Sequence, residues 1–270
     1  MTDYSSLESI RVVVKDSVAL VTLDRPDSLN AVDHLMHQEL EEVFGLVAED
    51  SEVNAVVLTG AGKAFSAGGD LRGMQDRARD PDGLREYVHG WILQGPRKLV
   101  RNLLEVPQPI IAAVNGHAIG LGATLALLSD IIIASEEARI GDPHVSVGIV
   151  AGDGGAAIWP LLVSLSKAKE MLLTGDLVSA KEALGLGLVN HVVTREEVVP
   201  EAMKLAQRLA SGPTLAIRWT KMALNKRLRD EVNLVLEASL ATEGLSFLSR
   251  DHAEAVDAFL EKRKPDFQGR

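Results

Sequence analysis

The chain contains no cysteine among its 270 residues. Disulfide bonds, thiolate nucleophiles and cysteine-ligated metals are therefore excluded, while the redox state of the compartment is left open. Basic residues are in deficit, because 28 lysines and arginines face 38 acidic residues and give a formal net charge of −10. This balance argues against a nucleic-acid-binding surface, although a local basic patch could still bind a phosphate.

The N-terminal segment from Met1 to Ser9 lacks the basic and apolar parts of a secretory signal, so we expect a cytoplasmic location. Formal charges are also missing between Glu105 and Asp130, a stretch long enough to raise the question of a membrane span. Prolines, glycines and polar residues interrupt it, among them Pro107, Asn115 and Gly120. We therefore interpret it as a buried strand followed by a helix and expect no contact with a membrane.

This uncharged stretch contains the segment around which the chain is organised. An apolar run from Ile110 to Val114 leads into the turn Gly116-His117-Ala118-Ile119-Gly120-Leu121-Gly122, and a second apolar run covers Leu125 to Leu128. Glycines allow positive φ angles and close backbone approach, so the pattern predicts a strand, a tight turn and a helix. A helix N-terminus leaves backbone N–H groups free, and these can hold an anion or a developing oxyanion.

Short β-rich runs and helical periodicities alternate up to about residue 195, which predicts an α/β fold. The runs at 10–14 and 18–23 indicate a hairpin, and further strands are expected at 55–58, 131–134, 138–141 and 188–193. From residue 196 strand signals stop and helical periodicity continues. We divide the chain into a strand-rich core, 1–195, and a helical C-terminal region, 196–270, with no low-complexity linker between them.

Residue types that are typical of helix ends support the positions of several expected helices. Asp33 can cap a first helix, and Ser179 with Glu182 three residues later forms a capping box for another. The segment 82–104 reads as helical with a break at Gly95-Pro96. A second stop and restart is expected at Gly212-Pro213.

Two nucleotide-binding motifs are incomplete. Gly62-Lys63 lacks the glycine five positions earlier and the following Ser or Thr of a P-loop, since Val57 and Ala64 stand there. Gly120-Leu121-Gly122 fails as a dinucleotide fingerprint because Leu125 occupies the third glycine position. These glycines therefore serve another purpose.

The histidines give no metal motif. His34 and His37 lie three apart on the first expected helix, but no recognised ligand spacing surrounds them, so we expect both on a solvated helix face. His89, in the long helical segment, stays open as a cleft residue. We predict no metal site.

Two turns could act together. Ala67-Gly68-Gly69-Asp70 follows one expected strand just as Gly120-Leu121-Gly122 follows another. If each turn offers a backbone N–H to the same oxygen, the pair can polarise a thioester carbonyl toward an enolate or a tetrahedral oxyanion. The sequence leaves their convergence open, because tight packing turns have the same composition.

Several motifs, taken in order along the chain, resemble the crotonase superfamily, which is the enoyl-CoA hydratase/isomerase family. No single motif is specific, but the ordered set covers essentially the whole chain. The motifs are Leu23-Asp24-Arg25-Pro26 with Leu29-Asn30-Ala31, Lys63-Ala64-Phe65-Ser66-Ala67-Gly68-Gly69-Asp70, Ala113-Val114-Asn115-Gly116-His117-Ala118-Ile119-Gly120, Leu173-Thr174-Gly175-Asp176 and Phe259-Leu260-Glu261-Lys262-Arg263-Lys264-Pro265.

The resemblance implies a spiral of β-β-α turns with a helical C-terminal region that caps the core and joins subunits into homotrimers, which often pair into hexamers. It also implies an acyl-CoA substrate whose thioester oxygen lies between the amides of Gly69 and Leu121. No metal or redox cofactor is implied, and coenzyme A enters as part of the substrate. The implied CoA-binding residues are Arg25, Leu29, Ala67, Asp70 and Leu71.

The sequence departs from the family pattern at the catalytic positions. Hydratases of the family use two glutamates, because adding water across a double bond needs a base at one carbon and an acid at its neighbour. Thr124 and His144 stand at those two positions. Asp153, in a glycine-rich loop where other family members place an aspartate, is the candidate replacement; its alternative role is to cap a helix beginning near Gly154.

We therefore interpret the chain as an acyl-CoA-processing enzyme of the enoyl-CoA hydratase/isomerase type, with Asp153 as principal acid/base. His144 could be a second acid or base or a polar lining residue, since imidazole titrates near neutral pH. Two alternatives stay open: a CoA-thioester hydrolase or dehalogenase with Asp153 as nucleophile, and a non-catalytic CoA-binding protein. The acyl group is not identified, and we expect residues 73–99 to shape its end of the pocket.

Overall fold

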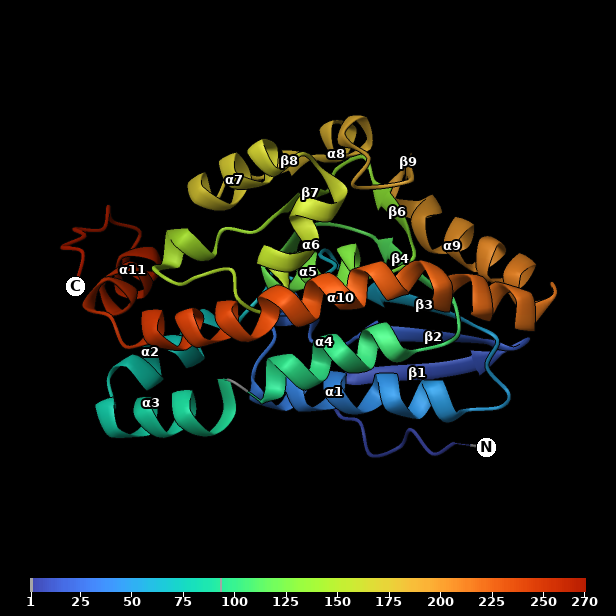
Figure 1. Cartoon of the computed structure of the whole chain (residues 1–270), viewed down its shortest axis with the longest axis horizontal. Coiled ribbons are helices and arrows are strands. Elements are labelled where there is room, and N and C mark those ends of the chain that lie inside the picture. Colours follow the sequence, from blue (N-terminus) through green and yellow to red (C-terminus); the bar gives the residue numbers. More distant parts are fainter. Residues whose placement is uncertain (1, 93) are drawn as a thin grey trace.

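A six-stranded sheet forms the centre of the computed structural model, which describes residues 2–92 and 94–270 (Figure 1). Its order is β1-β2-β3-β4-β6-β9. The first two strands form the predicted antiparallel hairpin, and every later pair is parallel. The strands are β1 (Ile10–Lys15), β2 (Val18–Leu23), β3 (Ala55–Gly60), β4 (Ile110–Val114), β6 (Ile131–Ser135) and β9 (His191–Val193).

A smaller sheet stands beside the first. It contains β5 (Ala118–Ile119), β7 (Arg139–Gly141) and β8 (Val178–Ser179), with β5 parallel and β8 antiparallel to β7. The organising turn therefore contains a two-residue strand that the sequence did not predict. Helix α5 (Leu121–Leu127) follows directly, as expected for a strand, turn and helix.

Helices cover both faces of the central sheet. On one face, small residues of α9 (Arg195–Ala210), including Ala202 and Ala206, pack on Val57 and Ile111. The opposite face is covered mainly by α1 (His34–Glu49), α4 (Gly95–Glu105) and α10 (Thr214–Phe247), which bury the larger apolar core. Within the described residues, no helix combines the length and apolarity that crossing a bilayer requires.

The remaining helical segments lie mostly around the ends of the sheets. At one end of the molecule, α11 packs on α2, and η2 contacts the far end of α10 (Figure 1). These segments are η1 (Pro26–Ser28), α2 (Leu71–Ala78), α3 (Pro81–Tyr87), η2 (Val88–Ile92), η3 (His144–Val147), α6 (Gly155–Leu162), α7 (Leu165–Thr174), α8 (Ala180–Leu186) and α11 (Arg250–Glu261).

The expected helix ends are confirmed. The Asp33 side chain accepts from the Met36 amide at the start of α1, and Ser179 with Glu182 forms the capping box of α8. Helix α4 starts at Gly95, and α9 ends before the Gly212-Pro213 restart. The π-helical turn η2 was not predicted, because its residues have an ordinary helical pattern.

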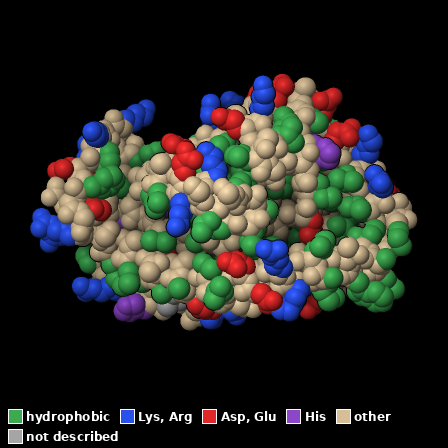
Figure 2. Space-filling model, turned by 45° about the horizontal axis from the view of Figure 1, so that its top comes forward, with side chains coloured by type: hydrophobic (Ala, Val, Ile, Leu, Met, Phe, Trp, Pro, Cys, Tyr) green, Lys and Arg blue, Asp and Glu red, His purple; other side chains and the backbone are tan. Residues whose placement is uncertain are grey.

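The 34-residue α10 is the longest helix described, and its two halves differ. Its second half buries polar as well as apolar side chains. Its first half exposes Leu215, Trp219 and Leu224. Hydrophobic side chains gather on the surface at the end where α9 and α10 meet (Figure 2). These residues form an apolar surface patch, which differs from the single exposed hydrophobic residues that are normal on folded proteins.

Candidate active site

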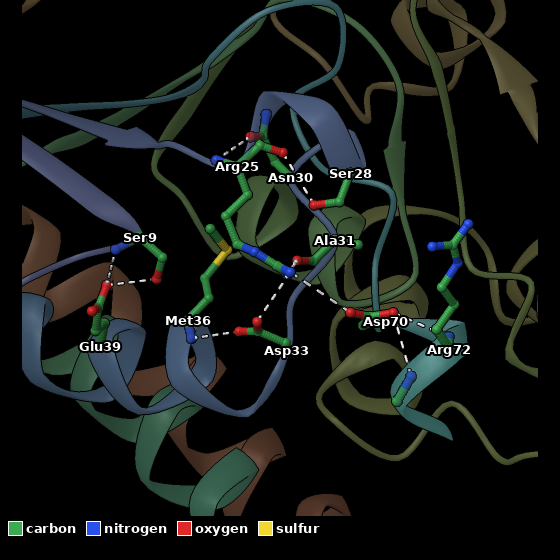
Figure 3. Close-up of polar contacts among 11 residues, drawn as sticks. Ser9, Arg25, Ser28, Asn30, Ala31, Asp33, Met36, Glu39, Asp70 and Arg72 are labelled. Carbon is green, nitrogen blue, oxygen red and sulfur yellow. Dashed lines mark hydrogen bonds and ion pairs between the residues drawn. The ribbon is translucent and has the colours of Figure 1, made fainter. Parts of the chain in front are cut away.

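The loop after β2 is held by a network of polar contacts (Figure 3). The Arg25 amide donates to Asn30 Oδ1 at 2.9 Å, and Asn30 Nδ2 donates to carbonyls of the 61–65 loop. The Arg25 guanidinium lies 3.1 Å from the carboxylate of Asp33 and 3.8 Å from that of Asp70. Two of the residues expected to bind coenzyme A, Arg25 and Asp70, are therefore neighbours in space.

The two glycine turns lie directly against each other, which the sequence had left open. The Ile119 amide donates to the Ser66 carbonyl at 3.0 Å. Gly68 has φ +83°, and a Cβ there would lie 2.7 Å from the Ile119 carbonyl oxygen, so no other residue allows this approach. As a result, Gly69 and Leu121 line the same cavity.

The backbone amides of Gly69 and Leu121 take no part in the hydrogen bonds of the neighbouring bridge and helix. The bridge between Val32 and Gly69 uses the Gly68 carbonyl and the Asp70 amide, not the Gly69 amide. Leu121 is the first residue of α5, so its amide has no acceptor within the helix. Neither amide is therefore used by the hydrogen bonds of the bridge or of the helix.

The cavity that these turns line has a volume of about 60 Å³. Polar side chains form the wall next to Leu121, whereas apolar and aromatic residues form much of the remainder. The polar wall includes His144, Asp153 and Glu243, and the apolar lining includes Met74, Tyr87, Trp91 and Phe247.

The three predicted catalytic side chains come together. Asp153 is buried, with Thr124 Oγ1 donating to its Oδ1 at 3.4 Å and His144 Nε2 lying 3.6 Å from its Oδ2. The other ring nitrogen of His144 pairs with Asp142 in a very short contact. His144 therefore lies between two carboxylates, and Thr124 orients one of them.

Asp153 does not cap α6, so that alternative reading of the residue is wrong. The N-cap position belongs to Gly154, and no side chain accepts a hydrogen bond there. Gly154 has φ +118°, a conformation that L side chains rarely adopt. Because Gly154 makes this turn before α6, the Asp153 carboxylate contacts Thr124 and His144 and not the start of the helix.

The charges of the cluster depend on one another. Burial alone would lower the pKa of His144, but the carboxylates of Asp142 and Asp153 outweigh it and raise the pKa to about 10. Burial raises the pKa of Asp153, and the His144 charge opposes that rise. The two carboxylates thus favour the protonated form of His144, and the raised pKa makes Asp153 a stronger base than an ordinary aspartate.

Glu243 is a fourth member of the site that the sequence analysis missed. It comes from α10, is 3% exposed, and has an Oε2 atom with no hydrogen-bond partner among the described residues. Burial, with Asp153 close by, raises its pKa well above the ordinary value. A Cβ at Gly152 would lie 2.5 Å from that Oε2, so the glycine makes room for the carboxyl. The sequence itself carries no signal of this approach, because only the fold brings Gly152 and Glu243 together.

The expectation that both His34 and His37 lie on a solvated helix face is wrong for His37. His34 is exposed, but His37 is 4% exposed and lines the cavity. The reason is Trp91 from η2, whose ring centroid lies 4.4 Å from that of His37. His89 is exposed and belongs to the same turn.

Asp142, His144 and Asp153 could offer three ligand atoms to a metal ion, since these atoms lie within 4.8 Å of one another. Both nitrogens of His144 already face carboxylates, at Asp142 and at Asp153. A cation would have to displace the imidazolium from one of them. The protonated imidazole of His144 itself supplies a positive charge between the carboxylates of Asp142 and Asp153.

A second cavity of about 160 Å³ adjoins the first, and the two share Gly69 and His144. It is lined by Ala67 and Leu71, two further residues expected to bind coenzyme A, and by Phe259 of α11. Leu29, the remaining expected CoA-binding residue, is 45% exposed. The expected CoA-binding residues therefore lie in two segments, one after β2 and one at the start of α2.

Comparison with known sequences decides the family. The sequence model described as Enoyl-CoA hydratase/isomerase matches residues 14–270. The chain belongs to the enoyl-CoA hydratase/isomerase family. As expected of this family, the fold is of the crotonase type, with a helical C-terminal region.

Members of the family with different activities are similar to the chain over almost all of their length. It is 37% identical to the short-chain-enoyl-CoA hydratase of Clostridium acetobutylicum over 259 residues, 96% of this chain and 97% of that protein. It is 35% identical to the 1,2-epoxyphenylacetyl-CoA isomerase of Escherichia coli over 264 residues, 98% of this chain and all of that protein.

A solved member of the family has the same fold. The crystal structure of an enoyl-CoA hydratase/isomerase from Mycobacterium paratuberculosis has a TM-score of 0.86 and 39% identity, over 92% of this chain and 97% of that one. The protein is thus an enzyme of the enoyl-CoA hydratase/isomerase family, and acyl-CoA processing is its activity class.

Proposed function

We propose that the enzyme forms a thioester enolate between the amides of Gly69 and Leu121 and moves protons on it with Asp153. The observation that carries the proposal is that Gly69, Leu121 and the buried Asp153 line one cavity. An oxyanion held by two backbone donors acidifies the carbon next to the thioester, and a nearby base can then remove its proton.

Proton transfer between the α and γ carbons, which is double-bond isomerisation, fits this site best. Asp153 removes the proton and can return it to the other carbon, because its raised pKa makes the protonated state accessible. The His144 cation stabilises the carboxylate whenever the proton is on the substrate. Thr124 keeps one oxygen of Asp153 in place.

Hydration is the second candidate, and Glu243 is the observation that favours it. With neither family glutamate present, the site still holds two carboxyl groups, Asp153 and Glu243, on one cavity. One can act as base toward water while the other, protonated by burial, supplies the proton.

A panel of enoyl-CoA thioesters, assayed with wild type, Asp153→Asn and His144→Ala, tests the proposal. We expect Asp153→Asn to lose turnover and α-proton exchange in D₂O by about 10²-fold or more while still binding CoA esters. Full activity of Asp153→Asn on the best substrate would contradict the assignment. A covalent adduct on Asp153 would instead indicate the hydrolase or dehalogenase reading. Binding without any turnover by wild type would indicate a non-catalytic protein.

We also propose that the chain forms homotrimers or hexamers in the cytoplasm. The exposed apolar residues of α10 support assembly, because a patch of this kind is usually covered. Sedimentation of wild type beside Trp219→Glu tests this, and we expect the variant to shift toward the monomer mass. A wild-type monomer would contradict the proposal.

A further inference from the structure

The imidazole of His37 has one nitrogen that the folded chain leaves unused. Nδ1 lies 3.0 Å from Glu41 Oε1, and the other oxygen of Glu41 lies 3.4 Å from Lys98 Nζ. Nε2 is buried and has no partner among the residues that the structure describes. Buried polar atoms are nearly always hydrogen-bonded in folded proteins, and His37 lines the cavity, so its unpartnered nitrogen points to a ligand atom.

The surroundings of His37 are aromatic. The chain has only ten Trp, Tyr and Phe residues, and three of them, Tyr87, Trp91 and Phe247, line this cavity. Trp91 stacks on Tyr87 with ring centroids 4.9 Å apart and meets His37 edge to face at 4.4 Å. Such a rigid wall favours a flat or cyclic group, because ring contacts add attraction beyond the apolar area that they bury.

We propose that the acyl group contains an aromatic or cyclic body that packs on Tyr87, Trp91 and Phe247 and bears a hydroxyl group bound by His37 Nε2. A hydroxyl both donates and accepts, so it satisfies this nitrogen whether the imidazole is neutral or charged. Because the Glu41 carboxylate can only accept, the neutral ring has its proton on Nδ1, and a carbonyl oxygen therefore satisfies Nε2 only when the ring is charged. The proposal rests on the proposed function in one respect, namely that this cavity holds the acyl group.

Binding of unreactive saturated thioesters tests the proposal without any catalytic step. The probes are phenylacetyl-CoA, its three hydroxyphenyl analogues, the three methylphenyl analogues and linear octanoyl-CoA, with Kd measured by calorimetry. Methyl and hydroxyl groups are close in size, so each pair isolates the hydrogen bond. We expect at least one hydroxyl analogue to bind about tenfold more tightly than its methyl partner. We also expect phenylacetyl-CoA to bind more tightly than octanoyl-CoA.

The variants His37→Phe and His37→Gln separate recognition from packing. His37→Phe should bind the hydroxyl and methyl partners equally and keep the preference for the ring, whereas His37→Gln should retain part of the hydroxyl preference. The same change at the exposed His89 is the matched control and should leave every Kd ratio as in wild type. If His37→Phe does not fold, the test uses His37→Gln, which replaces the ring, and Glu41→Gln, which changes the partner of Nδ1.

Three results would overturn the proposal. They are the absence of any hydroxyl preference in wild type, its full retention in His37→Phe, and tighter binding of octanoyl-CoA than of phenylacetyl-CoA. Failure of the proposed function is distinguishable, because it would appear as undiminished turnover in Asp153→Asn and would leave these binding ratios unchanged.

Discussion

The Gly69 and Leu121 amides belong to turns fixed by the sheets, whereas the acidic groups of the same cavity come from a loop and a distant helix. The amides depend on backbone geometry, so side-chain substitutions along the turns leave them in place. Asp153 and Glu243 can each be changed by one substitution. On the proposed function, this difference lets one fold keep thioester binding while its proton chemistry varies.

We call the Gly69 and Leu121 amides the backbone half of the site, and the titratable side chains Asp153, His144 and Glu243 the side-chain half. The largest effect is expected from removing one amide of the backbone half. Leu121 is the first residue of α5, a position where proline is tolerated, so Leu121→Pro deletes the N–H with little change of fold. We expect kcat to fall about 10²–10³-fold, as on loss of other oxyanion donors. Leu121→Ala keeps the amide and should retain most activity. Equal losses in both variants would show that the side chain, not the amide, matters.

A smaller loss is expected from Glu243→Gln on the side-chain half. Glutamine has the same size but supplies no proton, so hydration should slow by about 10²-fold while isomerisation, which relies on Asp153, is affected less. Steady-state rates on a hydratable and an isomerisable enoyl-CoA measure the ratio. The control is Glu237→Gln, an exposed residue of the same helix. If both rates stay at the wild-type value, Glu243 has no part in the chemistry.

The two halves should also differ in pH dependence, because only the side-chain half titrates. The pKa of His144 is about 10 in the folded protein, above the ordinary 6.5, so its stabilising contribution is complete below pH 6.5 and is lost as the pH rises toward 10. Between pH 7 and 9 this loss amounts to about 2–3 kcal/mol. Urea unfolding at several pH values should show a steeper decline for wild type than for His144→Gln. Parallel curves would mean that His144 is neutral in the folded protein.

Sequence reasoning identified the two glycine turns because the residues of each turn are contiguous. Each glycine turn is a short motif after a strand, so it can be recognised from the residues that flank Gly69 or Leu121. Asp153 could also be found, since it stands alone between glycines in a loop. What the sequence could not supply is the pairing of distant segments, such as the register that brings Ser66 against Ile119.

The side-chain half shows the limit more clearly. His37 and Glu243 lie on helices whose patterns are typical of surface positions, and only the packing of η2 and α10 buries them. The number of partners that a buried side chain makes is a property of the tertiary structure. Helix periodicity therefore predicted the elements well and the burial of individual polar residues poorly.

The position of Glu243 near the end of α10 has a consequence for the order in which the site is made. Both glycine turns, His144 and Asp153 lie within the first 155 residues, whereas Glu243 follows Asp153 by about 90 residues along the chain. During synthesis the sheets and the two glycine turns can form before α10 exists. The cavity then acquires its last carboxyl group when α10 docks against Gly152, so on the proposed function the nascent chain still lacks one of its acids.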